Sequence, residues 1–188
     1  MKTYIALFRG INVGGHNLIK MNDLVTLCEG LGFAHVRTYI QSGNLVFDCP
    51  ETALAILEKK LADAVMSAAG FRPAMMVFSP EMMTAVVANN PFPEAVETPQ
   101  FLQLYFLVSS KSITDNDMAA LQALAIPSER FSLIGRCFYL HAPEGIGRSK
   151  LAVKVENILG VPMTCRNWRT VMRIQALVVE MPGYFPPL

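Results

Sequence analysis

Apolar and polar positions along the chain follow two periods, one typical of strands and one typical of helices. Short apolar or alternating runs predict strands, and apolar residues at helical spacing predict helices. In the first part of the chain the predicted order is a strand at residues 3–9, a helix at 21–32, two strands within 36–49, a helix at 51–70 and a strand at 71–79. Ser42, Gly43 and Asn44 separate the paired strands, as expected of a hairpin.

The same order of elements recurs in the second part of the chain. The pattern there predicts a strand at 102–109, a helix at 113–125, two strands within 129–142, a helix at 149–160, a strand at 161–166 and a last helix at 167–181. A short helix at about 80–89 and a segment with three prolines separate the two parts. We therefore expect an N-terminal half at 1–88, a proline-rich linker at 89–101 and a C-terminal half with an extra helix and tail at 102–188.

This order of elements predicts a fold class. Strand–helix–strand–strand–helix–strand is the split βαβ plan of a ferredoxin-like sheet. The expected class is α+β, with two ferredoxin-like (αβ-plait, βαββαβ) halves and an added C-terminal helix. The two halves share the order of their elements without obvious residue identity.

Two of the predicted helices carry their charges in the reverse of the usual order. The helix dipole favours acids in the first turn and bases in the last, by about 0.3–1 kcal/mol each. Glu51, Glu81 and Asp115 follow that rule in three other helices, whereas the helices at 149–160 and 167–181 begin among bases. The residues at these two starts are Arg148, Ser149, Lys150, Arg166, Asn167 and Arg169.

A bound anion at one or both helix starts would account for this reversal. Free N–H groups at a helix start attract anions, and adjacent Arg or Lys side chains strengthen the attraction. Ser149 and Asn167 are good N-cap residues, and either side chain could also turn toward a ligand. The alternative is that these bases pair with Asp or Glu from elsewhere in the fold. We expect a phosphate or carboxylate site, with structural ion pairs as the competing hypothesis.

Polar residues in two loops of the first half extend the candidate site. The loop after the first strand contributes Arg9, Asn12, Gly14 and Gly15, where glycines let backbone N–H groups approach a ligand or simply form a tight turn. Secondary candidates at the hairpin are Tyr39, Gln41, Ser42 and Asn44, although a turn favours such residues anyway. Trp168, the single tryptophan, could stack on a base or ring or anchor a core.

Other kinds of site lack their sequence signatures. Residues 145–150 read Gly-Ile-Gly-Arg-Ser-Lys, without the lysine directly after the second glycine that a P-loop needs. Residues 9–15, RGINVGG, do not match the dinucleotide fingerprint either. The four cysteines are widely separated, so we expect reduced, mostly buried thiols. These cysteines and three scattered histidines predict no metal site, and no cofactor is expected.

The amino-acid composition favours some kinds of binding partner over others. Of 188 residues, 16% are charged, against about 25% in typical soluble domains. This sparse charge and a mean hydropathy of +0.34 fit an extensive core or a homodimer. The net charge is +1, and nucleic-acid binders are usually more basic, so a small anionic ligand is favoured over nucleic acid.

The sequence shows no sign of membrane insertion or export. No apolar run approaches the roughly 20 residues of a membrane helix. The first fifteen residues lack the long apolar region and small-residue cleavage site of a signal peptide, and they fit a strand. We therefore expect a cytoplasmic protein with no membrane partner.

Seven short segments together resemble a known family. In order they read FRGINVGG, MNDL, LGF, VRTYIQSGNLVF, NPF, EGIGRSKL and TCRNWRTV. This combination, over about residues 3–178, is similar to a bacterial family, domain of unknown function 1697. The resemblance implies two αβ-plait subdomains and no activity, because that family has none assigned. Its segments include the Arg, Asn, Ser and Lys positions that stand out by charge.

Three functions are consistent with these observations. The first is binding of a small phosphate- or carboxylate-bearing ligand, with or without catalysis, in which Lys150 is best placed as electrophile or desolvated base. The second is nucleic-acid binding, with Phe47 and Tyr139 as stacking aromatics. The third is a protein interface, in which the basic residues pair between the halves. No catalytic triad order, metal set or paired carboxylates accompany the motifs, so enzyme activity stays open.

Overall fold

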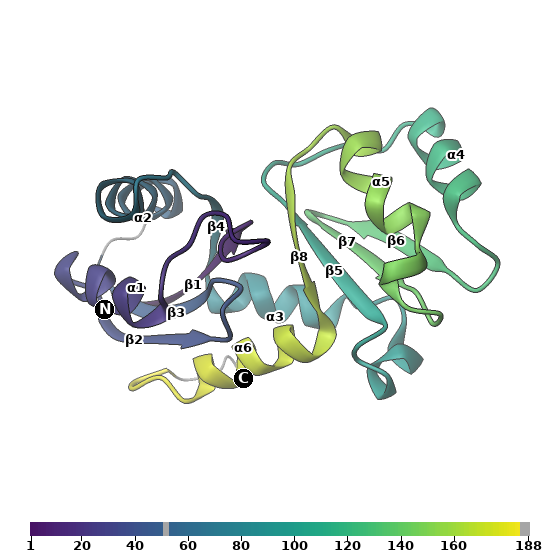
Figure 1. The fold of residues 1–188 in the computed structure, drawn as a ribbon. Coiled ribbons are helices and arrows are strands. Elements are labelled where there is room, and N and C mark those ends of the chain that lie inside the picture. The colour runs from purple at the N-terminus through teal and green to yellow at the C-terminus, as the bar shows by residue number, and fades with distance from the viewer. Residues whose placement is uncertain (51–52, 185–188) are drawn as a thin grey trace. The chain divides into compact units, whose positions relative to one another are not determined.

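The fold is α+β, and the computed structural model describes residues 1–50 and 53–184 (Figure 1). The described residues form two four-stranded antiparallel sheets and six α-helices. The chain divides into two compact units, Met1–Ala85 with Met172–Leu188 and Val86–Val171. This division falls inside helices α3 (Pro80–Ala88) and α6 (Trp168–Val179), so the units differ from the expected halves in the placement of both helices.

The first unit contains the first set of predicted elements in the predicted order. They are β1 (Lys2–Arg9), α1 (Met21–Gly30), β2 (Ala34–Tyr39), β3 (Asn44–Cys49), α2 (Leu54–Ala69) and β4 (Ala74–Phe78). The strands lie in the order β2-β3-β1-β4, with every neighbouring pair antiparallel. The predicted hairpin joins β2 and β3, because the turn at residues 40–43 connects them directly.

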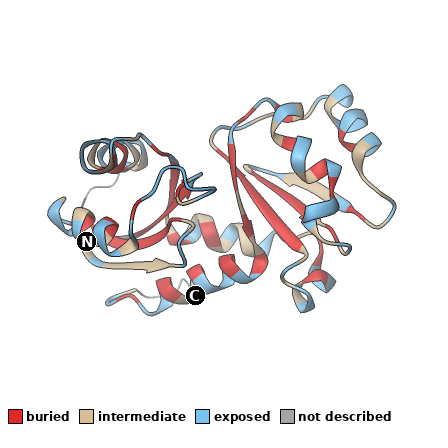
Figure 2. Cartoon of the chain, viewed as in Figure 1, coloured by how far each residue is buried: buried red, intermediate tan, exposed pale blue. Residues whose placement is uncertain are grey.

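Apolar side chains of α1 and α2 pack on one face of this sheet. Leu24 and Cys28 from α1 meet Leu57 and Leu61 from α2 in a buried cluster with side chains of the strands. Figure 2 shows these helices buried on one side and exposed on the other, as their helical spacing requires. Gly32 follows α1 with a φ of 83°, the left-handed conformation that commonly ends a helix.

The second unit contains the second set of elements. They are a 3₁₀ turn η1 (Pro93–Glu97), β5 (Leu102–Leu107), α4 (Asp115–Leu124), β6 (Arg130–Ile134), β7 (Cys137–His141), a 3₁₀ turn η2 (Ile146–Arg148), α5 (Lys150–Leu159) and β8 (Met163–Asn167). The strand order is β6-β7-β5-β8, again antiparallel throughout. The sequence predicted all of these except the two 3₁₀ turns, which are too short to show a period.

One face of the second sheet carries α4 and α5. Leu121 of α4 and Leu151, Val155 and Leu159 of α5 are buried with Phe138 and other strand residues in one apolar cluster. β6 and β7 are joined by a turn that contains Gly135, where φ is 59°. The packing of α5 on the sheet determines where this helix begins relative to the ends of the strands.

The charge pattern of the helix starts is as the sequence predicted. Glu81 lies in the first turn of α3, and Asp115 with Asp117 lies in the first turn of α4. Neither α5 nor α6 has an acid in its first turn. Glu51 lies outside the described residues.

Thiols and helix lengths complete the comparison with the sequence. The four cysteines form no disulfide with one another, and three of them, Cys28, Cys49 and Cys137, are buried, as expected of mostly buried thiols. Across 1–50 and 53–184, no group of three or more potential metal-ligating side chains comes together. Within those same ranges, no helix is both long and apolar enough to cross a membrane. The cytoplasmic location stays a prediction.

Candidate functional site

Two strands of the second sheet end beside the start of β5. His141, the last residue of β7, is paired with Leu102, and Asn167, the last residue of β8, is paired with Gln103. Since β7 and β8 flank β5, their ends are two strand spacings apart, about 10 Å. α5 follows β7 and α6 follows β8, so both helices with reversed charges begin at this end of the sheet.

We call this region the basic end. Its exposed cations are Arg130, Arg148, Lys150 and Arg169.

Consecutive turns keep the start of α5 close to the strand ends. The N–H of Ala142 donates to the carbonyl of Phe101 at 2.9 Å, which ties the chain after β7 to the residue before β5. The N–H of Gly145 donates to Ala142, and that of Arg148 donates to Gly145, at 2.9 and 3.3 Å. Six residues, 142–147, therefore separate His141 from Arg148 without carrying the chain far from the sheet.

Ser149 and Asn167 both act as N-caps. The hydroxyl of Ser149, which is 2% exposed, accepts from the N–H of Ala152 at 2.9 Å. The Oδ1 of Asn167 accepts from the N–H of Thr170, also at 2.9 Å. Capping is thus confirmed for both side chains. The earlier N–H groups of a helix's first turn have no partner within the helix, so they stay available to an anion.

Three cations of the basic end have no acidic partner in the described part of the chain. Arg148, Lys150 and Arg169 are exposed, and none of them takes part in an ion pair or side-chain hydrogen bond with another described residue. The competing hypothesis, that these bases form structural ion pairs, therefore has no support at these three positions. Their charges remain available to a ligand.

Arg166 is in a different situation, although the sequence placed it in the same cluster. It is 7% exposed, and its Nη1 donates to the Thr164 hydroxyl at 2.8 Å and to the Cys165 carbonyl at 2.7 Å. Burial lowers the pKa of the Arg166 guanidinium to about 10, so the group stays charged at neutral pH. Its side chain belongs to the sheet, and we leave it out of the ligand groups proposed below.

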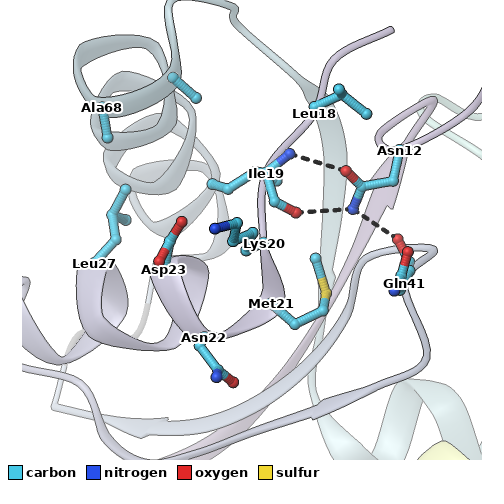
Figure 3. A pocket seen from close by; sticks show the side chains of 11 residues that line it. Asn12, Leu18, Ile19, Lys20, Met21, Asn22, Asp23, Leu27, Gln41 and Ala68 are labelled. Carbon is cyan, nitrogen blue, oxygen red and sulfur yellow. Dashed lines mark hydrogen bonds between the residues drawn. The ribbon is translucent and has the colours of Figure 1, made fainter. Parts of the chain in front are cut away.

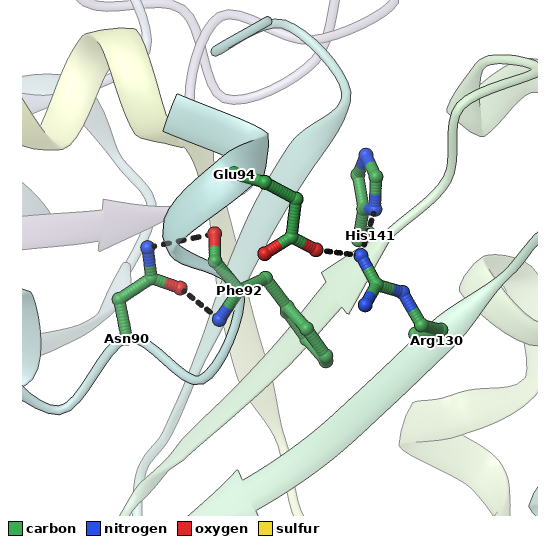
Figure 4. Close-up of polar contacts among 5 residues, drawn as sticks. All are labelled: Asn90, Phe92, Glu94, Arg130 and His141. Carbon is green, nitrogen blue, oxygen red and sulfur yellow. Dashed lines mark hydrogen bonds and ion pairs between the residues drawn. The ribbon is translucent and has the colours of Figure 1, made fainter. Parts of the chain in front are cut away.

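Arg130 and His141 belong to the basic end, and the sequence did not single them out. Nη2 of Arg130 donates to Nδ1 of His141 at 3.2 Å and forms an ion pair with Glu94 (Figure 4). The guanidinium also lies over the ring of Phe92, 5.0 Å from its centre. Only the pairing of β6 with β7 brings these residues together, so no local sequence signal could have found them.

In the first unit, Asn12 organises the loop after β1. Its Nδ2 donates to the carbonyls of Ile19 and Gln41 at 2.9 and 3.0 Å, and its Oδ1 accepts from the N–H of Ile19 at 2.9 Å (Figure 3). Both amide hydrogens are therefore used within the protein. Gly14 and Gly15, with φ of 58° and 80°, form the tight turn between Val13 and His16.

A groove of about 860 Å³ lies beside this loop, at the start of α1 (Figure 3). Asn12, Lys20 and Gln41 line it together with residues of the first turn of α1. No side chain caps this helix at Lys20, but Asp23 in the first turn offsets the positive end of the dipole. The sequence pattern did not indicate this groove.

The remaining hairpin candidates serve the turn between β2 and β3. Asn44 is 1% exposed, and its Nδ2 donates to the Tyr39 carbonyl at 2.9 Å and to the Ser42 hydroxyl at 3.0 Å. Arg9 is exposed at the end of β1. In the first unit the fold thus places Asn12 next to Gln41 and Ser42 next to Asn44. The candidates of the second unit lie at the basic end.

The aromatic candidates are buried. Trp168 is 6% exposed, which fits a core anchor. The Phe47 ring stacks on that of Phe33 with centres 4.5 Å apart, and the Tyr139 hydroxyl donates to the carbonyl of Val86 at 2.7 Å. Phe47 and Tyr139 therefore offer no exposed surface on which bases could stack.

Comparison with known proteins places the chain in a family. The family model described as "Protein of unknown function (DUF1697)" matches residues 1–139. The chain belongs to this family. It is also similar to a solved structure, that of the conserved bacterial protein SP0830 from Streptococcus pneumoniae, with 25% identity, a TM-score of 0.68 and coverage of 93% of this chain and 97% of that one. A comparison with curated proteins gives no match.

Membership of the DUF1697 family carries no activity with it. The family match ends at residue 139, before Arg148 and the starts of α5 and α6. A function for this DUF1697 protein therefore has to be argued from the geometry and charge of its own residues.

Proposed function

We propose that the protein binds a small ligand through a phosphate or carboxylate group at the basic end of the second sheet. The observation that carries this proposal is the pairing of His141 and Asn167 with the first two residues of β5. Because of this register, α5 and α6 begin at one end of one sheet. The partial positive charges of both helix starts then act on the same region.

The side chains at these starts add full charges to the helix dipoles. Arg148 and Lys150 stand at the start of α5 and Arg169 at the start of α6, all exposed. Guanidinium groups bind phosphate and carboxylate oxygens in pairs, and the Lys ammonium adds a point charge. A ligand with one anionic group between the two starts, or with one group at each, fits this arrangement.

Binding is supported better than catalysis at this site. Lys150 is exposed, whereas a lysine that works as a base or nucleophile is usually desolvated. Nδ1 of His141 faces the guanidinium of Arg130, so that nitrogen is not free to accept a proton from a substrate. We therefore assign a binding role and no reaction.

A small molecule also fits the protein better than a nucleic acid. The net charge is +1, and Phe47 and Tyr139 are buried. Single-strand binding relies on exposed aromatic surfaces and an extended positive groove. A cation cluster confined to one sheet end suits a compact ligand.

We also infer that each sheet with its two covering helices is a ferredoxin-like αβ-plait. The element order βαββαβ supports this inference, as does the strand order in which the first strand lies between the third and the fourth. In this arrangement the second covering helix of each unit, α2 or α5, starts at the end of the sheet where the first strand of that unit, β1 or β5, begins. The basic end is therefore a consequence of the topology of the second unit.

A thermal-shift panel at constant ionic strength tests the proposal. Phosphate, sulfate, sugar phosphates, dicarboxylates, nucleotides and short RNA would be compared with chloride, for the wild type and for Arg148→Ala and Lys150→Ala. A ligand at about 100 times its dissociation constant adds roughly 2.7 kcal/mol of stability. We expect one class of anion to stabilise the wild type and to lose its effect in both variants.

Lys154→Ala is the matched control, because Lys154 is an exposed lysine of the same helix, one turn beyond its start. It should retain the stabilisation. If no anion stabilises the wild type, or if Lys154→Ala abolishes the effect as fully as Lys150→Ala, the proposed site is wrong.

A further inference from the structure

β6 (Arg130–Ile134) is an outer strand of the second sheet with an open edge. The order β6-β7-β5-β8 gives it one neighbour, and its register with β7 runs without interruption from Arg130 to Ile134. An outer strand presents N–H and C=O groups to which another chain can pair. In the described part of the protein, no hydrogen bond reaches the main chain of Arg130–Ile134 from the side away from β7.

The equivalent outer strand of the first sheet is blocked. The register of β2 with β3 shifts between Ala34 and Arg37, and His35 within that shift has a φ of 51°. Bulges and irregular backbone are common means of preventing edge-to-edge pairing. β6 has no register shift, no proline and no residue with positive φ. The two sheets therefore differ at these equivalent outer strands, because β6 can accept another strand and β2 cannot.

The hairpin geometry determines which groups of β6 point outward. Ile134 and Cys137 flank the two-residue turn Gly135–Arg136, so they form a hydrogen-bonded pair. Hydrogen-bonded and non-hydrogen-bonded pairs alternate along an antiparallel ladder. Phe131 and Leu133 therefore direct their N–H and C=O groups away from β7, while their side chains pack against the core of the unit.

We propose that this open edge pairs antiparallel with the same edge of a second copy of the chain, about a two-fold axis through Ser132. The two four-stranded sheets then continue into one. Phe131 of each copy lies opposite Leu133 of the other, and each such pair exchanges both of its N–H···O bonds. The outward groups of β6 are all satisfied in this arrangement.

The sequence of β6 is self-complementary in this register. Phe131 opposite Leu133 is an aromatic–aliphatic pair of the kind that stabilises sheets. On the axis, the small and uncharged side chain of Ser132 faces Ser132 of the other copy. Arg130 lies opposite Ile134 of the other copy, so no like charges face each other. The low content of charged residues, 16%, is in keeping with a protein that buries surface between copies.

Light scattering coupled to size-exclusion chromatography tests this dimer on the full chain. The wild type should be dimeric at micromolar or higher concentration. Ser132→Lys and Ser132→Glu each place like charges on the axis, with Cβ atoms about 4.5–5.5 Å apart, and should weaken the dimer roughly tenfold or more. Mixing the two variants should restore it as a heterodimer. Ser132→Thr, which adds no charge, should behave as the wild type.

Cross-linking gives a second measurement that does not depend on the stability of charged variants. Under mild oxidation, Ser132→Cys should form a disulfide-linked dimer, because the two side chains meet at the axis. Ile134→Cys, which faces Arg130 of the other copy, should cross-link far more slowly. A monomeric wild type, a dimer indifferent to both charges at Ser132, or equal cross-linking of the two cysteine variants would overturn the proposal.

Discussion

Nη2 of Arg130 lies 3.2 Å from Nδ1 of His141, where β6 begins and β7 ends. A guanidinium can only donate, so Nδ1 must accept, and the imidazole is neutral with its hydrogen on Nε2. Burial, and then the charge of Arg130, hold the pKa of His141 below its ordinary value of about 6.5. The neutral form is therefore the one that the fold favours.

This contact predicts a pH dependence of stability. A group with a lowered pKa in the folded state contributes stability that is complete above its ordinary pKa and is lost as the pH falls through the lowered value. We expect an NMR titration to place the pKa of His141 below about 6.5 and to find it raised in Arg130→Gln. Lys154→Gln serves as the control. A His141 pKa at or above 6.5 in the wild type would contradict this account.

Asn167 allows helix capping to be separated from charge. Asp caps a helix about as well as Asn, so Asn167→Asp should unfold at a similar or slightly higher urea concentration than the wild type. Asn167→Ala should lose about 1 kcal/mol of unfolding free energy, because the N–H of Thr170 loses its acceptor. Phosphate binding should weaken in the Asp variant, since a carboxylate beside Arg169 repels an anion, and should survive better in the Ala variant. The reverse order of binding would count against the basic end.

Gly43 has no room for a side chain. An added Cβ would lie 2.5 Å from Cβ of Phe8 and 2.6 Å from Cδ1 of Ile11, and φ is +72°. Gly10 has a similar φ of +65° but nothing within 4 Å, so it isolates the backbone cost. We expect Gly10→Ala to cost about 1–2 kcal/mol and Gly43→Ala roughly 1–3 kcal/mol more. Equal losses in urea unfolding would show that the close contact is relieved without cost.

The thiols should be inert in the folded protein. Burial, with a smaller contribution from Glu29, raises the pKa of Cys28 to about 12, and burial also raises the pKa of the Cys137 thiol. The thiolate is the reactive form, so both should react with a disulfide reagent at neutral pH only on unfolding. Mass spectrometry after native labelling measures this directly. Rapid native labelling of Cys28 would contradict the buried position assigned to it.

Sequence periodicity was sufficient to predict the helices and strands, but it could not predict which of them meet at the candidate site. Leu151, Val155 and Leu159 are spaced for one helix face, so α5 and its buried side could be predicted from local pattern. The proximity of His141 and Asn167 depends on which strands flank β5, and this register is a non-local property. For this reason the sequence could not tell that the two reversed helices start at one sheet end.

The surroundings of some individual side chains also could not be predicted from the sequence. Arg166 lies in a strand whose sequence shows no alternation, so its burial on the face of Thr164 could not be read from the pattern. Asn12 looked like a ligand group, but its amide is used by Ile19 and Gln41, residues brought to it by the folding of two loops. Ser149 and Asn167, in contrast, were identified as caps because capping depends on local sequence alone.

The most direct test of the central claim is a phosphate titration followed by backbone amide NMR at constant ionic strength. If α5 and α6 begin at one anion site, the amides of residues 150–151 and 168–169 should shift together with a single dissociation constant. The amides at the start of α4, which is capped by Thr114 and Asp117, should not move. Lys150→Ala should weaken both sets of shifts. Shifts that follow two unrelated dissociation constants, or that appear only at the start of α1, would contradict a shared anion site at the basic end.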